Sequence, residues 1–423
     1  MEISATGAMI GLIVAIVLII YKVNPSYCLM FGALLGGLLG GNGSLTDRLP
    51  ETVKLMIDGA KDITPATLRI IAAGVLAGVL IESGAAARIA LTITKICGDR
   101  FSLLAVALAT MLLTTVGVFI DISVITVSPI ALAVAKKIGF SRGSVLLAMI
   151  GGGKSGNLIS PNPNTIATAT EFKVDLSELM FANLIPAVVG LAFTVILTSL
   201  LTKRGESVTD ADDVDLRNLP SIGTAILGPL VAIFLLTLRP FCGVVVDPLV
   251  ALPVGGIAGC LAMGKFARIR DYMNVGLSKM VGVAVLLMGT GTLAGIIKAS
   301  AFKTVLINVM EHCGLPGFML APVSGIVMSA ATASTTAGAT VASQTFSAAL
   351  LAMGLTSLAA ATMIHAGATV LDHLPHGTFF HATGGAVGMK IGDRLKLIPY
   401  ETLIGGVLVL VSTLLHGAAL STD

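Results

Sequence analysis

The chain has 423 residues, of which 55% are hydrophobic and only 12% are charged, and its mean hydropathy is +0.97. Soluble globular proteins carry about 25% charged residues, so the composition excludes that class. The net charge of +3 comes without a basic block, tryptophan is absent and tyrosine is rare, which argues against a nucleic-acid partner.

Long stretches of the chain carry no charge, among them residues 3–21, 101–120 and 402–422. Each is close to the roughly 20 residues, at about 1.5 Å apiece, that a helix needs to cross a bilayer. The sequence therefore predicts an all-α polytopic protein surrounded by lipid. The five cysteines are scattered and odd in number, so neither a disulfide framework nor a zinc ribbon is expected, and no cofactor or metal is predicted.

The first repeat is expected over residues 1–205 and begins with spanning helices near 5–21, 24–41 and 66–87. The next apolar stretch, residues 101–137, is too long for one helix and carries polar residues in its middle. Polar backbone at membrane depth is tolerated only when it is buried in protein or lines a wet cavity. The stretch is therefore predicted to form a re-entrant hairpin.

A broken helix is expected at about 144–180. Its break, GGGKSGNLISPNPN at residues 151–164, combines glycine, which weakens a helix, with proline, which removes a backbone donor. The whole stretch is predicted to unwind, and a last spanning helix follows at 179–202.

The second repeat, residues 219–423, follows a polar linker at 206–218 and has the same order. LAGVLIESGAAARIALTITKICG from Leu76 resembles LAGIIKASAFKTVLINVMEHCG from Leu293. The corresponding elements are helices at 218–238, 246–264 and 280–301, a hairpin at about 318–353, a helix at about 356–390 broken over 365–377, and a last helix at 400–420.

Each half contains about five crossings and one hairpin, so the second half enters the membrane inverted relative to the first. With both termini on the outer side, seventeen basic residues fall on the cytoplasmic side and eight outside. This distribution follows the positive-inside bias. The sequence thus predicts two inverted repeats with outer termini.

Inverted repeats with broken helices place a substrate site at the bilayer midplane, where helix N-termini attract anions and exposed carbonyls hold cations. The candidate substrate-binding residues are Thr114, Thr115, Ser123, Lys154, Ser155, Asn157, Asn162, Asn164, Thr165, Ser334, Thr335, Thr336 and His376. The candidate ion-coupling residues are Asp121, His365, Asp372 and His373. Helix capping selects the same serine and threonine residues, so each one alone is a weak signal.

Lys154 is costly at membrane depth unless it is paired. It either binds a substrate carboxylate or forms a structural ion pair with Asp121 or Asp372. The two aspartates either couple transport to protons or sodium, or cap the broken helix ends. Three histidines lie close to Asp372 in the sequence. Because histidine titrates near physiological pH, they favour a role for Asp372 in ion coupling.

The chain resembles the gluconate permease family of bacterial proton symporters, in the broader ion transporter superfamily. The resemblance rests on GALLGGLLGG (32–41), LIESGAAARIA (80–90), GGGKSGNLISPNPNTIATA (151–169) and GMKIGDRLKLIPYETLIGG (388–406). It implies a homodimer in the bacterial inner membrane, with a transport domain of about 66–180 and 280–390 and the remainder as a scaffold.

The predicted function is secondary active transport of a small organic anion, such as a sugar acid or another carboxylate, by an elevator-type motion. Proton-coupled symport is favoured, and sodium-coupled transport of a carboxylate or an amino acid is the close alternative. A hypothesis from another class is an intramembrane metalloenzyme that uses the histidines between His365 and His381. Pro375 disrupts the helical spacing that such a metal site needs, and no nucleophile is evident, so no enzyme activity is expected.

Overall fold

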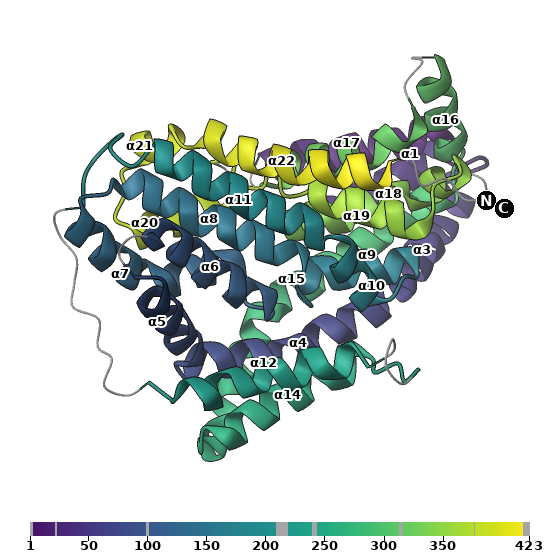
Figure 1. Cartoon of the computed structure of the whole chain (residues 1–423). Helices are drawn as coiled ribbons and strands as arrows, with labels where there is room; N and C mark the ends of the chain where they lie inside the picture. The colour runs from purple at the N-terminus through teal and green to yellow at the C-terminus, as the bar shows by residue number, and fades with distance from the viewer. Residues whose placement is uncertain are drawn as a thin grey trace.

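The computed structural model describes residues 3–21, 23–98, 101–208, 219–238, 243–312, 316–375 and 377–417. Within these ranges the regular structure is helical, with three isolated β-bridges (Figure 1). The helices of the first half are α1 (Ala5–Ile20), α2 (Pro25–Gly40), α3 (Leu45–Asp62), α4 (Thr64–Glu82), α5 (Ala85–Cys97), α6 (Ser102–Thr115), α7 (Ile120–Ile138), α8 (Arg142–Leu158), α9 (Pro163–Phe172), α10 (Leu176–Ala182) and α11 (Leu184–Leu200).

The second half repeats this order of helices. Its elements are α12 (Ile222–Leu236), α14 (Pro248–Ala262), η2 (Phe266–Arg268), α15 (Ile269–Lys298), α16 (Phe302–His312), η3 (Gly317–Met319), α17 (Leu320–Thr332), α18 (Thr335–Ala352), α19 (Ser357–Gly367), α20 (Thr378–Ala386), α21 (Ile391–Leu395) and α22 (Ile398–His416). The all-helical fold agrees with the prediction. The segments predicted as re-entrant hairpins, 101–137 and 318–353, form the helix–turn–helix segments α6–α7 and α17–α18, and the two predicted breaks contain the ends of α8 and α19. The expected linker, 206–218, lies mostly outside the described residues.

Helix packing is also duplicated between the halves. Helix α1 packs on α2 as α12 packs on α14, and α2 contacts α15 as α14 contacts α4. Likewise, α8 packs on α6 and α11, and α19 packs on α17 and α22. The last helix of each half, expected in the scaffold, therefore lies against the broken helix of its own half.

The helices form two groups, which Figure 1 shows as separate layers. Helices α4, α12 and α14 lie along the lower side of the view, and α8, α11, α19 and α22 lie along the upper side. Glycines let α4 and α15 approach closely inside the lower group. A Cβ atom at Gly276 would lie 1.8 Å from the Gly74 carbonyl oxygen, so the crossing requires glycine.

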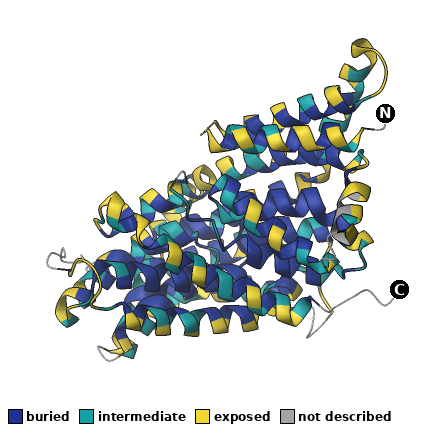
Figure 2. Cartoon of the chain, turned by 90° about the horizontal axis from the view of Figure 1, so that it is seen from above, coloured by how far each residue is buried: buried dark blue, intermediate teal, exposed yellow. Residues whose placement is uncertain are grey.

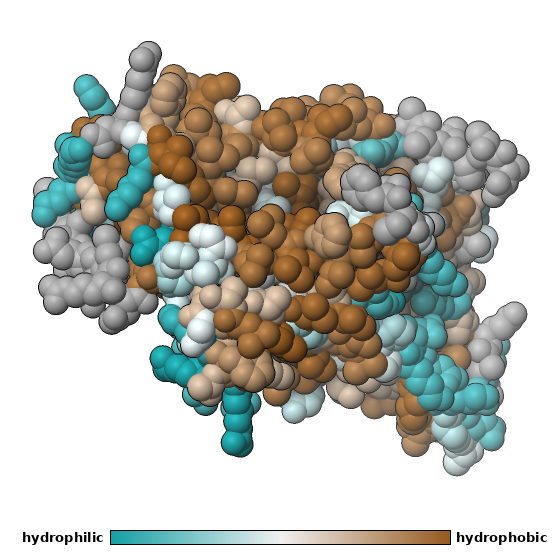
Figure 3. All heavy atoms as spheres, turned by 60° about the horizontal axis from the view of Figure 1, so that its bottom comes forward, coloured by the Kyte–Doolittle hydropathy of each residue, from teal (hydrophilic) through white to brown (hydrophobic). Residues whose placement is uncertain are grey.

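Long apolar segments agree with a multi-pass membrane protein. Among the described residues, three helical segments are long and apolar enough to span a bilayer: Thr64–Glu82, Phe266–Lys298 and Ile391–His416. The pair α10 and α11 passes the same test together but bends by 43°, and α1, α2, α6, α12 and α14 are shorter apolar helices. Hydrophobic side chains cover the middle of one face, with hydrophilic side chains gathered toward its sides (Figure 3).

Two predicted boundaries were wrong. The helix expected at 66–87 ends at Glu82, because Gly84 takes a left-handed backbone (φ +78°) before α5 begins. The break expected over 151–164 is irregular only over 159–162. Residues 151–158 stay helical, because their glycines serve packing: a Cβ atom at Gly152 would lie 2.0 Å from the Ala107 carbonyl oxygen of α6.

A third difference is α3, which the sequence interpretation missed. This helix is amphipathic and highly charged, so it does not resemble a spanning segment, and only Thr52 and Gly59 are buried. It packs against α15 and α2.

In the whole molecule, buried residues follow the inner helix faces and exposed residues lie at the periphery (Figure 2).

Candidate functional site

A cavity of about 350 Å³ lies where both helix–turn–helix segments and both breaks meet α15. We call it the central cavity. Its polar lining residues are Asp121, Asn157, Asn164, Lys279, Ser334, Thr335, Thr336, Asp372 and Thr378. The apolar wall includes Phe119, Ile122, Val283, Leu286 and Phe379.

The N-terminal ends of four helices lie at the central cavity: α7, α9, α18 and α20. Asp121, Asn164, Thr335 and Thr378, each in the first turn of one of these helices, line it. The first N–H groups of a helix have no partner within the helix, and the helix dipole places positive charge at the same end. Four such ends around one cavity favour a bound anion.

Side chains cap two of the four helix ends. The Asn162 side chain accepts a hydrogen bond from Thr165 N at the start of α9, and Ser334 accepts one from Ala337 N at the start of α18. Neither α7 nor α20 has a side-chain cap hydrogen bond. At α7, the N–H groups of Asp121 and Ile122 already face the Asp121 carboxylate, so α20 offers the freer N–H groups to a ligand.

Lys154 and Asp372 form a buried ion pair beside the cavity. The Lys154 Nζ lies 2.6 Å from Asp372 Oδ1 and 2.5 Å from the Thr369 carbonyl oxygen, and the two side chains are 0% and 2% exposed. Thr335 donates its hydroxyl to the other Asp372 oxygen at 2.6 Å. Asp372 lines the cavity, whereas Lys154 lies behind it, so the pair is the structural alternative that the sequence had left open.

His373 extends this pair away from the cavity. Its Nε2 lies 3.2 Å from the Ile398 carbonyl oxygen, which can only accept, so Nε2 carries a proton. Its Nδ1 lies 3.1 Å from Lys154 Nζ and 3.2 Å from Asp372 Oδ1, so it contacts both members of the pair. His373 thereby connects the ion pair to the start of α22.

Asn164 connects the cavity to His365. Thr336 donates to Asn164 Oδ1 at 3.1 Å, and the Asn164 Nδ2 group lies 3.0 Å from His365 Nε2. Because an amide nitrogen only donates, His365 Nε2 accepts and the ring proton lies on Nδ1. That Nδ1 is buried and has no hydrogen-bond partner among the residues that the structure describes. His365 contacts this amide rather than Asp372.

Several predicted site residues lie away from the cavity lining. The hydroxyls of Thr114 and Thr115 bond to carbonyls of their own helix α6. Ser123 and Ser155 are buried, and neither hydroxyl has a partner. The Thr165 hydroxyl donates to the Asn162 side chain, and Asn162 in turn donates to Asn157. His376 lies outside the described residues.

The histidines of the metalloenzyme hypothesis do not converge. His365 contacts Asn164, His373 contacts the ion pair, and His381 Nε2 lies 2.9 Å from the Pro375 carbonyl oxygen. Across the described ranges, no group of three His, Cys, Asp or Glu side chains could hold a metal ion.

Two cavity residues were missed by sequence reasoning, Lys279 and Thr378. Lys279 is one of the seventeen basic residues counted on the cytoplasmic side as evidence of topology, although it is a charge within a long apolar helix. Thr378 directly follows the second predicted break, 365–377, as Thr165 directly follows the first, 151–164. It is also the first residue of α20. Their positions within the repeats were the available signal.

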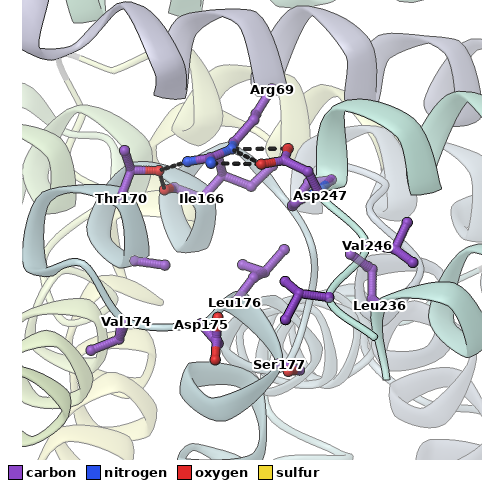
Figure 4. Close-up of a pocket in the computed structure, with 13 residues that line it drawn as sticks. Arg69, Ile166, Thr170, Val174, Asp175, Leu176, Ser177, Leu236, Val246 and Asp247 are labelled. Atoms are coloured by element: carbon purple, nitrogen blue, oxygen red, sulfur yellow. Dashed lines mark hydrogen bonds and ion pairs between the residues drawn. The ribbon is translucent and has the colours of Figure 1, made fainter. Parts of the chain in front are cut away.

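A smaller cavity of about 120 Å³ lies between α4, α9, α12 and α14 (Figure 4). At its edge, Arg69 Nη1 donates to Thr170 Oγ1 at 2.9 Å, and Arg69 Nη2 lies 2.6 Å from Asp247 Oδ2. Burial acts to raise the pKa of Asp247, but the Arg69 hydrogen bonds and charge hold that pKa below its usual range. The next residue of α9, Glu171, pairs with Lys298 at 3.2 Å.

We call these four residues, Arg69, Thr170, Glu171 and Lys298, the α9 latch. Two cations from α4 and α15 hold two consecutive residues of α9. Ser347 of α18 also donates to Glu171 at 2.9 Å. The α9 latch therefore joins the two layers of helices at some distance along α9 from the central cavity.

A polytopic helical fold that surrounds a buried polar cavity with broken helices is typical of a membrane transporter. Comparison with known proteins agrees. A family described as GntP family permease matches residues 3–252, and one described as Na⁺-H⁺ antiporter family matches residues 223–313. The chain belongs to the GntP permease family, and it is a transporter rather than an enzyme.

Individual relatives support this assignment. An uncharacterized transporter of Haemophilus influenzae is 57% identical over 98% of each chain. The high-affinity gluconate transporter of Escherichia coli is 23% identical over 93% of this chain and 94% of that protein. The solved structure of the YdaH transporter of Alcanivorax borkumensis has the same fold, with a TM-score of 0.69 and 17% identity over 96% of this chain and 100% of that chain.

Proposed function

We propose that the protein is a proton-coupled symporter of a small organic anion that binds in the central cavity. The single observation that carries this proposal is the meeting of four helix N-termini at one polar cavity. The substrate carboxylate lies at the freer N–H groups of α20. Asn157, Asn164, Ser334, Thr335 and Thr336 are the side chains proposed to bind its carboxylate or hydroxyl groups.

Proton coupling is supported by the two acidic residues in the cavity wall. Asp372 is neutralised by Lys154, and Thr335 bonds its second oxygen. Asp121 has no ion pair within 4 Å among the described side chains. An anion beside a charged Asp121 is repelled, so protonation of Asp121 favours anion binding and keeps the loaded site close to neutral.

Lys154 is proposed to act through Asp372. Its positive charge offsets that carboxylate, so Asp372 can stand at an anion site without repelling the ligand. Protonation of Asp372 would free Lys154 for direct contact with a substrate carboxylate. His373 holds the pair in place, and His365 orients the Asn164 amide.

Alternating access is proposed to occur by movement of one helix group against the other. The mobile group contains α5–α11 and α16–α22, and the supporting group contains α1–α4, α12, α14 and α15. This division differs from the expected transport domain of about 66–180 and 280–390. It places α11 and α22 in the mobile group, with the broken helices on which they pack, and it places α4 and α15 in the supporting group. The duplicated packing supports inverted repeats with two re-entrant hairpins. The basic residues support an inner-membrane protein with both termini on the outer side. Lys279, which is counted on the cytoplasmic side, lines the central cavity and so supports an opening toward the cytoplasm.

Sodium coupling is the second candidate, because the family match over residues 223–313 is to Na⁺-H⁺ antiporters. Purified protein in vesicles, given labelled carboxylates under a pH gradient or a sodium gradient, distinguishes the two ions. We expect the pH gradient to drive accumulation, and Asp121→Asn to permit exchange but not accumulation. Accumulation under the sodium gradient alone, or full accumulation by Asp121→Asn, contradicts the proposal.

A further inference from the structure

We propose that Lys279 is a positioning residue for proton release, which stabilises the charged carboxylate of Asp121 only while the central cavity is open. This inference rests on the proposed function and adds a residue that supplies the direction of coupling. Lys279 is neither a candidate substrate ligand nor a member of the Lys154–Asp372 pair.

The two charges face one cavity from different helix groups. Lys279 lies on α15, which packs mainly on α2, α3 and α4 of the supporting group and also contacts α18 of the mobile group. Asp121 lies in the first turn of α7, which packs on α5, α6, α8 and α20. A movement of one group against the other therefore changes the separation between Lys279 and Asp121.

Other charged groups near α7 are already engaged or lie elsewhere. Helix α6 carries no charged residue. On α8, Lys154 is bound to Asp372 and His373, and Arg142 donates to the Val387 carbonyl. On α5, Arg88 donates to the carbonyls of Leu219 and Pro220. On α20, His381 contacts the Pro375 carbonyl. The basic residues at the helix ends are Lys95 on α5, and Lys136 and Lys137 in the last turn of α7.

Lys279 is consequently the only cation that lines the central cavity among the described residues. It is exposed, and among the described residues no ion pair ties it to another carboxylate. An ammonium group near a carboxylate favours the charged form of that carboxylate. In the open cavity, Asp121 thus gives its proton to cavity water and remains as a carboxylate beside Lys279.

Movement away from Lys279 removes this compensation. A carboxylate without a nearby cation in a dry environment is costly, so Asp121 takes up a proton before or during the movement. Proton release is then confined to the state in which the cavity faces Lys279. This arrangement makes the proton and the anion leave on the same side.

Right-side-out membrane vesicles test the inference. Uptake of a transported carboxylate is measured while the internal pH is lowered in steps at fixed external pH. Internal acid slows proton release, so uptake falls with a characteristic midpoint. In Lys279→Gln the carboxylate form of Asp121 loses its support, and we expect the midpoint to rise by about one pH unit. Lys279→Arg should keep the parent midpoint.

Two further variants make the result specific. Lys396→Gln removes one exposed charge that pairs with Asp393, and it should leave the midpoint unchanged. Adding Lys279→Gln to Asp121→Asn should cause no shift. A parent-like midpoint in Lys279→Gln, or a raised KM with an unchanged midpoint, overturns the inference but leaves the proposed transport standing. Absence of carboxylate uptake by the parent protein overturns both.

Discussion

At the scale of single residues, the Lys154–Asp372 pair is the most demanding feature of the site. Both side chains are buried, and their remaining polar contacts are Thr369, Thr335 and His373. Removing one partner of a buried pair leaves the other charge without compensation, which costs far more than the pair contributes. The pair is therefore as much a constraint on the fold as a part of the site.

We predict that Asp372→Asn destabilises the protein by about 3–5 kcal/mol, because the Lys154 ammonium stays buried without its counter-charge. The double variant Asp372→Asn with Lys154→Gln should recover most of the lost stability, because both charges are then gone. Thermal unfolding of the detergent-solubilised protein measures both. The control is Asp393→Asn, which breaks the exposed pair with Lys396 and should leave the melting temperature nearly unchanged. Equal melting temperatures of the single and double variants would contradict this account.

At the scale of helices, α9 joins the binding site to the supporting group. Its first turn holds Asn164 at the central cavity, and its last turn holds Thr170 and Glu171 in the α9 latch. We infer that the latch stabilises the conformation in which the central cavity is open. These contacts have to separate when the mobile group moves.

We predict that Glu171→Gln raises the population of the closed-cavity state about threefold, as expected from ~0.7 kcal/mol for a partly exposed pair. A cysteine at position 282 reports the state, because Gly282 lines the cavity and nothing lies within 4 Å of an added Cβ atom. It should react more slowly with a membrane-impermeant thiol reagent in Glu171→Gln, and adding Lys298→Gln should have little further effect. The surface variant Lys61→Gln should match the parent. Faster labelling in Glu171→Gln would show that the latch does not hold the cavity open.

Local sequence patterns predicted where the helices break, but they did not predict how long the first break is. Pro161 and Pro163 mark a break because proline removes backbone donors, which is a local effect. Whether Gly152 unwinds a helix or packs against another depends on α6, and only the folded chain shows that α6 lies there. The same reason explains why Lys154 could be given two roles, and why Lys279 was taken for a topology marker.

At the scale of the whole molecule, each half contributes two helix N-termini to the central cavity. Helices α7 and α9 come from the first half, and α18 and α20 come from the second. The sequence repeat predicted this pairing because corresponding segments occupy corresponding places. The repeat did not predict the conformation of the molecule, in which the central cavity is open. That conformation depends on α4 and α15, which occupy corresponding places in the two halves but contact their neighbours differently.

The central claim is that a carboxylate binds where these four helix ends meet. A cryo-EM map of the protein with a saturating transported carboxylate tests it most directly. We predict ligand density against the first turns of α7 and α20, within hydrogen-bond distance of Asn164 or Thr335. Ligand density confined to the smaller cavity beside Arg69, with the central cavity holding only water, would contradict the claim.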